Sequence, residues 1–244
     1  MPKAPAAEQL RLLDLAALDA KLHSLDVRRR AVEADPRLGP AKTALEQAAE
    51  AARSADALVA DAEAELAAVE AKVAEVSTRI ARDESRLYAG GLSKDLEALQ
   101  KDIAGLSARQ SDLEDTELEV LERLDELRAA QGEAAEALGR AQASSEELRD
   151  ELDEQLGAIA QERCAVAQQR SDFAAGIDAG LLDVYEKTLA KRGVGAARLF
   201  HGTSEGSGMA LSPGNLAAIR SAAEDEIVFC PDSGCILVRS PEWS

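Results

Sequence analysis

The sequence predicts a mainly α fold, in which a long antiparallel coiled-coil hairpin is followed by a small C-terminal domain with β-strands. Aromatic residues make up 2% of the 244 residues and charged residues make up 30%. Few rings leave few large side chains for a compact core, whereas the abundant Ala, Leu, Glu, Arg and Gln favour long helices. Apolar residues also recur at alternating steps of three and four, which is the pattern of a coiled-coil seam.

The first arm of the hairpin is predicted over residues 7–88. Pro36 and Pro40 predict a kink near residues 36–40, because proline removes a backbone donor and clashes with the preceding turn. Beyond the kink a nearly unbroken seam runs from Leu45 to Leu87, with Asp83 as its one polar position.

The second arm is predicted over residues 93–176, after a tip near residues 88–92 that contains Gly90 and Gly91. Its seam begins at Leu96, and scattered Gln, Glu and Ser occupy some of its positions. The arms are nearly equal in length, which favours a chain that folds back on itself. Folding the chain at the glycines sets small residues against large ones, with Ala52 opposite Leu127 and Ala55 opposite Leu124.

The coiled-coil pattern does not continue into the tail, so we expect residues 1–177 to form the hairpin and residues 178–244 to fold on their own. Asp178 can cap a short helix that stops at Gly193, and Ser212 can cap a second helix with Pro213 in its first position. The predicted strands are residues 196–200, 226–229 and 236–239, and the last two flank a turn that begins at Cys230.

Several of these motifs resemble a family of bacterial proteins with an N-terminal coiled-coil hairpin and a C-terminal C4-type zinc ribbon. The resemblance covers essentially the whole chain. It is carried by the tip motif, the short helix of the tail, the second tail helix and the start of the last turn: residues 86–90, residues 94–100, Leu182, Tyr185, Glu186, Ile219, Arg220 and residues 225–231.

The resemblance implies two Cys-x-x-Cys knuckles that hold zinc, but three of the four ligand positions here are serine. The first knuckle aligns with Ser204 and Ser207, and the second with Cys230 and Ser233. A neutral hydroxyl is a poor zinc ligand, whereas tetrahedral zinc prefers thiolate or imidazole. The favoured interpretation is therefore a metal-free ribbon with no cofactor, held by packing and hydrogen bonds.

Two alternatives stay open at these positions. One is a displaced Zn²⁺ site made of Cys230, Cys235 and His201, to which Glu205 or Asp232 adds an oxygen ligand. The other is a Cys230–Cys235 disulfide, which is less expected in a reducing cytosol.

Charge and topology signals favour a cytoplasmic protein that does not bind membranes. The formal net charge is −18 at pH 7, so the surface repels anionic lipids. No apolar run is long enough to span a bilayer, and the first residues lack the apolar core of a signal peptide. Three cysteines form no disulfide framework.

The sequence predicts no enzyme, because no nucleophile, base and acid converge in it and His23 stands alone on the first helix. We expect an adaptor or chaperone-like scaffold that binds other proteins through the coiled coil and the ribbon. Pairing into a homodimer stays open. The resemblance implies links to secretion or flagellar assembly, or to regulators of gene expression.

The alternative function is a nucleic-acid-binding zinc ribbon. It is disfavoured because binding to phosphates is driven by Lys and Arg. The three arginines of the ribbon, Arg198, Arg220 and Arg239, are outnumbered by acidic residues: Glu205, Glu224, Asp225, Glu226, Asp232 and Glu242.

Overall fold

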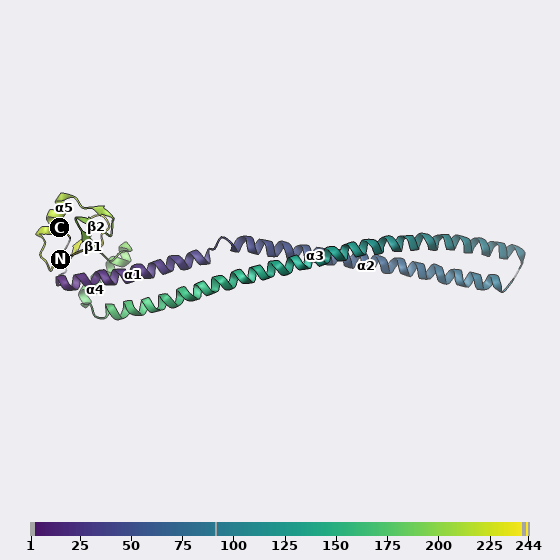
Figure 1. Cartoon of the computed structure of the whole chain (residues 1–244), viewed down its shortest axis with the longest axis horizontal. Helices are drawn as coiled ribbons and strands as arrows, with labels where there is room; N and C mark the ends of the chain where they lie inside the picture. Colours follow the sequence, from purple (N-terminus) through teal and green to yellow (C-terminus); the bar gives the residue numbers. More distant parts are fainter. Residues whose placement is uncertain (1–2, 91, 241–242, 244) are drawn as a thin grey trace. The chain divides into compact units, whose positions relative to one another are not determined.

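The structure is a computed structural model that describes residues 3–90, 92–240 and 243. Figure 1 shows three long helices, α1 (Ala6–Glu33), α2 (Leu38–Tyr88) and α3 (Ser93–Ala174), followed by shorter elements. These are α4 (Ala179–Arg192), β1 (Ala196–Phe200), β2 (Thr203–Ser204), β3 (Met209–Ala210), α5 (Pro213–Ser221), β4 (Val228–Phe229) and β5 (Ile236–Arg239). The predicted fold class, a long helical hairpin with a small strand-rich C-terminal part, is confirmed.

The chain divides into two compact units. Pro36–Asp150 form one, which we call the hairpin unit; Met1–Asp35 together with Glu151–Ser244 form the other, which we call the ribbon unit. α3 contributes to both. The boundary predicted between residues 177 and 178 therefore lies inside the ribbon unit.

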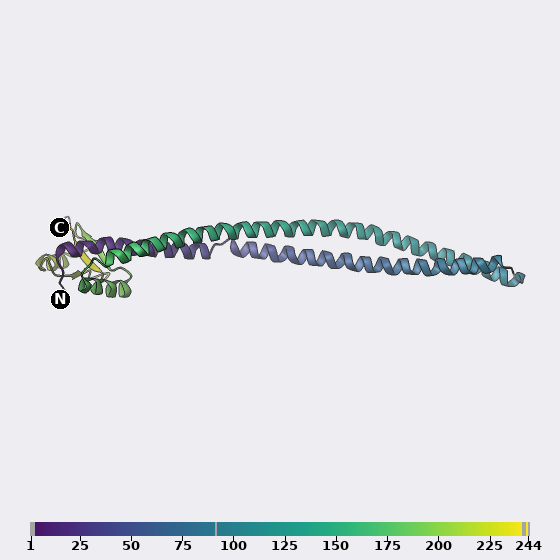
Figure 2. The same ribbon diagram turned by 90° about the horizontal axis from the view of Figure 1, so that it is seen from below.

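In the hairpin unit, α2 and the first part of α3 run antiparallel along an apolar seam (Figures 1 and 2). Val59 and Ala62 are buried against Leu124, with Leu66 and Leu127 packed beside them. At the flanks the Arg128 guanidinium donates to Glu63 at 2.8 Å, and the Gln131 amide donates to Asp56 at 2.7 Å.

These contacts correct the predicted pairing of the arms. Leu124 lies against Ala62 and Val59 rather than Ala55, so the register is shifted by about one heptad. A whole-heptad shift keeps every seam position facing its partner helix, so the periodicity alone does not reject it. The shift is taken up at the tip, where α3 begins beyond the last turn of α2 (Figure 2). Gly91 of the predicted tip lies outside the described residues.

Helical geometry is interrupted between Glu33, the last residue of α1, and Leu38, the first of α2. Pro36 lies in this interval, where the sequence predicted a kink. The predicted caps of the two short helices are also present. The Asp178 carboxylate accepts from the N–H groups of Gly180 and Leu181, both at 3.0 Å, and the Ser212 hydroxyl accepts from the Asn215 N–H at 3.2 Å.

The ribbon unit has a mixed sheet of strand order β3-β2-β1-β5-β4, in which β1 and β5 are parallel and the other neighbours antiparallel. Residues alternate between its two faces. One face buries Ala196, Ile236 and Val238 in a first cluster, and the other buries Ala197, Leu199 and Leu237 in a second.

The first cluster shows that the hydrophobic core of the tail is not made of tail residues alone. Leu12 and Leu15 of α1 are fully buried in it, together with Tyr185 of α4 and Ile236 of β5. Residues 178–244 were expected to fold independently. They instead share a core with α1, because one face of the short sheet and the apolar side of α4 are covered by that helix.

Candidate functional site

The candidate site lies where the β2–β3 turn meets the β4–β5 turn, on the second cluster of the sheet. The β4–β5 turn is tight: the Cys230 N–H donates to the Cys235 carbonyl at 2.8 Å, and the Gly234 N–H donates to the Cys230 carbonyl at 2.9 Å. Gly234 has φ +72°, a left-handed conformation in which a side chain is strained. The turn directs the side chains of Cys230, Ser233 and Cys235 toward the other turn.

The knuckle positions that the sequence singled out are close together. Cys230 Sγ lies 3.9 Å from the Ser207 hydroxyl of the opposite turn and 3.5 Å from the Ser233 N–H. The Ser233 hydroxyl lies 3.1 Å from Cys235 Sγ. We call Ser204, Ser207, Cys230, Ser233 and Cys235 the serine–thiol cluster.

Two features of this cluster were not foreseen from the sequence. The Ser204 hydroxyl is buried and makes no hydrogen bond among the described residues. Gly206 lies so close to the sheet that a Cβ at this position would stand 2.7 Å from Cys235 Sγ. A glycine between the two knuckle serines was the one sequence signal for this close approach.

The two thiols of the cluster differ in environment. Burial raises the pKa of the Cys230 thiol, but the surrounding serines and the backbone N–H groups of Ser233 and Asp232 outweigh it and lower the pKa to about 7. Burial raises the pKa of the Cys235 thiol, and this effect exceeds that of the nearby Ser233 hydroxyl.

The structure does not bring His201 into a ligand group with the cysteines. His201 is exposed in the β1–β2 turn, where its ring contacts that of Phe200 with centroids 4.2 Å apart. Glu205 is paired with Arg198 at 2.6 Å. Over residues 3–90, 92–240 and 243, no group of three or more His, Cys, Asp and Glu side chains could hold a metal ion. The set of Cys230, Cys235 and His201 stays a hypothesis.

The chemistry of the donors decides how well zinc would fit. The four family ligand positions hold the thiol of Cys230 and three hydroxyls, one of which, Ser204, has no partner among the described residues. Structural zinc sites take thiolate and imidazole ligands, and a neutral serine provides neither charge nor a soft donor. The four positions therefore do not fit a four-thiolate zinc site.

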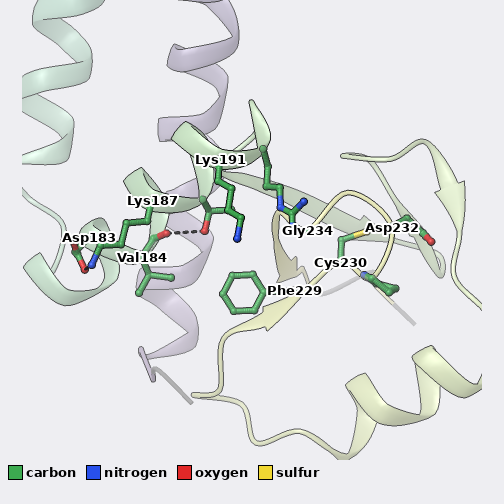
Figure 3. A pocket seen from close by; sticks show the side chains of 11 residues that line it. Asp183, Val184, Lys187, Lys191, Phe229, Cys230, Asp232 and Gly234 are labelled. Carbon is green, nitrogen blue, oxygen red and sulfur yellow. Dashed lines mark hydrogen bonds and ion pairs between the residues drawn. The ribbon is translucent and has the colours of Figure 1, made fainter.

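A pocket of about 550 Å³ opens beside the cluster, between α4 and the β4–β5 turn (Figure 3). Cys230 contributes to its lining, and Phe229, which is 42% exposed, stands at its centre in the view. The last turn of α4 adds Lys191 and Arg192, which are exposed and have no acidic partner among the described residues. The sequence did not predict this pocket, because it depends on how α4 packs on the sheet.

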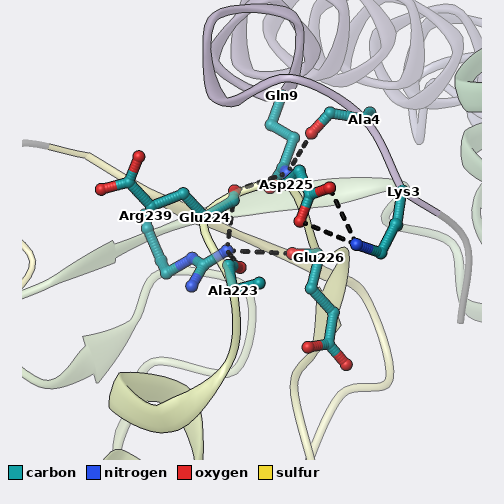
Figure 4. Close-up of polar contacts among 8 residues, drawn as sticks. All are labelled: Lys3, Ala4, Gln9, Ala223, Glu224, Asp225, Glu226 and Arg239. Atoms are coloured by element: carbon teal, nitrogen blue, oxygen red, sulfur yellow. Dashed lines mark hydrogen bonds and ion pairs between the residues drawn. The ribbon is translucent and has the colours of Figure 1, made fainter.

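Most arginines of the ribbon make contacts that stabilise the fold. Arg198 pairs with Glu205 and lies over the Phe200 ring at 4.6 Å. Arg239 donates to four backbone carbonyls of the loop before β4, those of Ala222, Ala223, Glu224 and Glu226, at 2.7–3.1 Å. Figure 4 shows this loop held also by Gln9 and Lys3.

A second polar cluster ties three helices of the ribbon unit together. Arg170 of α3 donates to Asp19 of α1 at 2.9 Å and to Glu186 of α4 at 2.5 Å, and the Tyr185 hydroxyl donates to Asp19 at 2.7 Å. Burial, followed by the carboxylate of Asp19, raises the pKa of Tyr185. Every member has a partner, which is the arrangement of a structural clamp rather than of a reactive site.

Nothing in the described part of the chain points to catalysis. The ionisable groups that lie close together there are ion pairs, and the two buried thiols face serines rather than a base. None of the described helices combines the length and the apolar character needed to cross a membrane.

Comparison with known proteins places both parts of the chain. Residues 15–193 match the family described as the CT398-like coiled coil hairpin domain, and residues 203–237 match the C4-type zinc ribbon domain. Uncharacterized protein Rv2229c and Uncharacterized protein MT2288, both of Mycobacterium tuberculosis, are 40% identical over 147 residues, which are 60% of this chain and 60% of each relative.

Two solved structures share the fold. A protein from Mycobacterium smegmatis superposes with a TM-score of 0.86 at 28% identity, covering 97% of this chain and all of that one. CT398 from Chlamydia trachomatis superposes with a TM-score of 0.66 at 18% identity, covering 96% and 98% of the two chains, and this likeness concerns the fold alone.

Proposed function

The chain belongs to the family of the CT398-like coiled coil hairpin domain, and from this premise we propose that it is a non-enzymatic scaffold that binds other proteins. The observation that carries the proposal is the tip of the hairpin unit, where two large apolar side chains face solvent. Tyr88, the last residue of α2, is 89% exposed, and Leu92 is 75% exposed. Neither side chain stabilises the fold by burial.

Exposed apolar groups at the end of a coiled coil are suited to binding. The seam of the hairpin unit buries its own apolar residues, so Tyr88 and Leu92 are available to a partner. Aromatic and large aliphatic side chains provide much of the free energy of protein–protein interfaces when they enter a partner's pocket.

The ribbon unit offers a second surface. The pocket beside α4 combines the exposed Phe229 ring with Lys191 and Arg192 (Figure 3). An apolar anchor next to positive charge favours a partner segment that carries an apolar side chain close to a carboxylate. Two separate surfaces on one chain are what an adaptor needs.

Within this function, a chaperone-like role that keeps a partner from aggregating, connected with secretion or with gene expression, is the finer form of the proposal. It follows from the family resemblance of the tip and tail motifs. A cytoplasmic location stays a prediction, which cell fractionation tests. Pairing into a homodimer stays an open alternative, which light scattering tests.

The experiment is affinity capture from native cells with three tagged full-length chains. One is wild type, one carries Tyr88→Ser and Leu92→Ser, and one carries Leu58→Ser, a matched control at a half-exposed leucine on the flank of α2. We expect a protein that wild type and the control retain and that the tip variant loses by about tenfold or more, the loss typical of a removed interface anchor.

A captured protein counts only if its purified form binds purified wild type and shows the same loss with the tip variant. A second variant, Phe229→Ser, alters the ribbon pocket. The proposal is contradicted if every protein recovered with wild type is recovered equally well with the tip variant and with Phe229→Ser. Chaperone-like activity adds the expectation that the chain suppresses aggregation of that partner.

The nucleic-acid alternative is weakened by the positions of the arginines. Arg198 and Arg239 are engaged with Glu205 and with the loop before β4. Measurable binding to RNA or DNA at low salt, weakening as salt is raised, would revive the alternative.

A further inference from the structure

We propose that Cys230 and Cys235 are a redox-active thiol pair, which reacts with a peroxide and closes to a disulfide across the β4–β5 turn. The proposal goes beyond the scaffold function and does not depend on it. It concerns the serine–thiol cluster, in which Cys235 adds a second thiol that is not one of the four family ligand positions.

The first observation is the backbone register. β4 and β5 pair Phe229 with Ile236, and the next opposed residues are Cys230 and Cys235, joined by a 2.8 Å N–H···O hydrogen bond. Hydrogen-bonded opposites in an antiparallel ladder have Cα atoms about 5.5 Å apart, which lies within the range of about 4.4–6.8 Å that disulfides span. The expected spacing of the two backbones is therefore compatible with a disulfide.

The second observation is that both side chains lie on one face of the sheet. Cys230 and Cys235 are buried in the same cluster as Leu199 and Leu237. Both sulfurs also meet Ser233: its N–H faces Cys230 Sγ at 3.5 Å and its hydroxyl faces Cys235 Sγ at 3.1 Å. The two sulfurs therefore converge on one residue between them in the turn.

The third observation is that the two thiols differ in access. Cys230, at 2% exposure, contributes to the lining of the pocket beside α4 (Figure 3). Cys235 is fully buried next to Gly206 and does not line the pocket. A small oxidant that enters the pocket reaches Cys230 first. Cys235 is then the neighbouring thiol that resolves the oxidised product.

The reaction balances with hydrogen peroxide as the oxidant. Cys230 Sγ attacks one peroxide oxygen, the O–O bond breaks, and the departing oxygen leaves as water with the thiol proton, so that Cys230 becomes a sulfenic acid. Cys235 Sγ then attacks the Cys230 sulfur, the S–O bond breaks, and the hydroxyl leaves as a second water with the Cys235 proton. A dithiol reductant reverses the change by thiol–disulfide exchange.

The experiment treats the purified full-length chain with hydrogen peroxide, unfolds it under acid, alkylates the remaining thiols and maps the peptides by mass spectrometry. We expect a Cys230–Cys235 peptide that lacks two hydrogens, is not alkylated and is restored by dithiothreitol. Cys164, exposed on α3, stays in its own peptide and serves as the internal control for access.

Matched variants separate the pair from general oxidation. Cys164→Ser should form the disulfide as wild type does, while Cys235→Ser should stop at oxidised Cys230. Oxidation should raise the melting temperature of wild type and not that of Cys235→Ser.

Three results would overturn the proposal. In the first, Cys230 and Cys235 are both alkylated at peroxide levels that oxidise Cys164. In the second, a disulfide joins Cys164 to either of them. In the third, the purified chain holds one equivalent of zinc that Cys230→Ser releases, because the thiols would then be metal ligands.

Discussion

The hairpin unit and the ribbon unit bury their apolar residues in different ways. The seam of the hairpin unit lies between two helices, so that Val59, Ala62 and Leu124 are each buried against a single facing helix. In the ribbon unit, Leu12, Tyr185 and Ile236 are fully buried between α1, α4 and the sheet.

This difference predicts where the loss of a single side chain lowers stability most. A repeating seam spreads its stability over many small contacts, and a layer can be altered without loss of the others. The ribbon unit instead depends on a few enclosed residues contributed by distant parts of the chain, so that its sheet, α1 and α4 should lose structure together.

The largest expected effect comes from Leu12→Ala, which removes an enclosed side chain of α1 from the core of the sheet. Large-to-small changes in such sites cost about 3 kcal/mol of unfolding free energy. Denaturant unfolding followed by fluorescence of Trp243, the single tryptophan, which packs on the second cluster, measures the loss. Leu10→Ala, at a partly exposed position of the same helix, should change little. An unchanged Trp243 transition in Leu12→Ala would show that the sheet does not rely on α1.

A smaller effect is expected from Arg170→Met, which leaves Asp19 and Glu186 without their shared cation. Charge-assisted hydrogen bonds at a partly buried site are worth about 2 kcal/mol. A double-mutant cycle with Asp19→Asn, read by the same unfolding curves, should show coupling between the two positions. Arg140→Met is the matched control, since its pair with Glu136 is exposed on the same helix. Equal losses in the two arginine variants would contradict the clamp.

In the hairpin unit a stabilising change is expected. Asp83 is a seam position with 7% exposure, and among the described residues its ion-pair partner is the exposed Arg86 at 3.6 Å. Asp83→Leu should complete the seam and add about 1 kcal/mol, because a poorly compensated buried carboxylate is replaced by an apolar side chain. Far-UV circular dichroism follows the helices on heating, and Glu84→Leu at the exposed neighbouring position should bring no gain. Destabilisation by Asp83→Leu would mean that the aspartate has a partner that the seam needs.

The smallest effect is expected from Ser204→Ala in the serine–thiol cluster. Its hydroxyl is buried and makes no hydrogen bond to the residues that the structure describes, so its removal should change stability by no more than about 0.5 kcal/mol. Ser212→Ala, which removes the cap of α5, should cost about 1 kcal/mol in the same assay. A loss on Ser204→Ala that exceeds that of Ser212→Ala would show that this hydroxyl binds something inside the ribbon.

Local signals explain what the sequence could predict of the fold. The cap at Asp178, the stop at Gly193 and the strand Ala196–Phe200 depend on neighbouring residues, and all three are found. The heptad register is a different matter. The pairing of Ala55 with Leu124 and that of Ala62 with Leu124 satisfy the same seam pattern, so the pattern does not choose between them, whereas the structure packs Leu124 on Ala62.

Contacts between distant segments explain what the sequence did not show. Leu12 and Leu15 follow the same spacing as the coiled-coil leucines after them, so nothing local marks them as part of the sheet's core. In the site, the convergence of Ser207, Cys230 and Ser233 follows from the family pattern. The pocket with Phe229 does not, because it is formed by the packing of α4 on the β4–β5 turn.

We propose that the ribbon unit is held by the core it shares with α1 and not by zinc. Thermal unfolding followed by Trp243 fluorescence, with and without a strong zinc chelator and combined with metal analysis of the same full-length protein, tests it most directly. We predict a chain without stoichiometric zinc, whose melting temperature the chelator leaves unchanged. One equivalent of zinc, together with a clear fall in melting temperature on chelation, would contradict the claim.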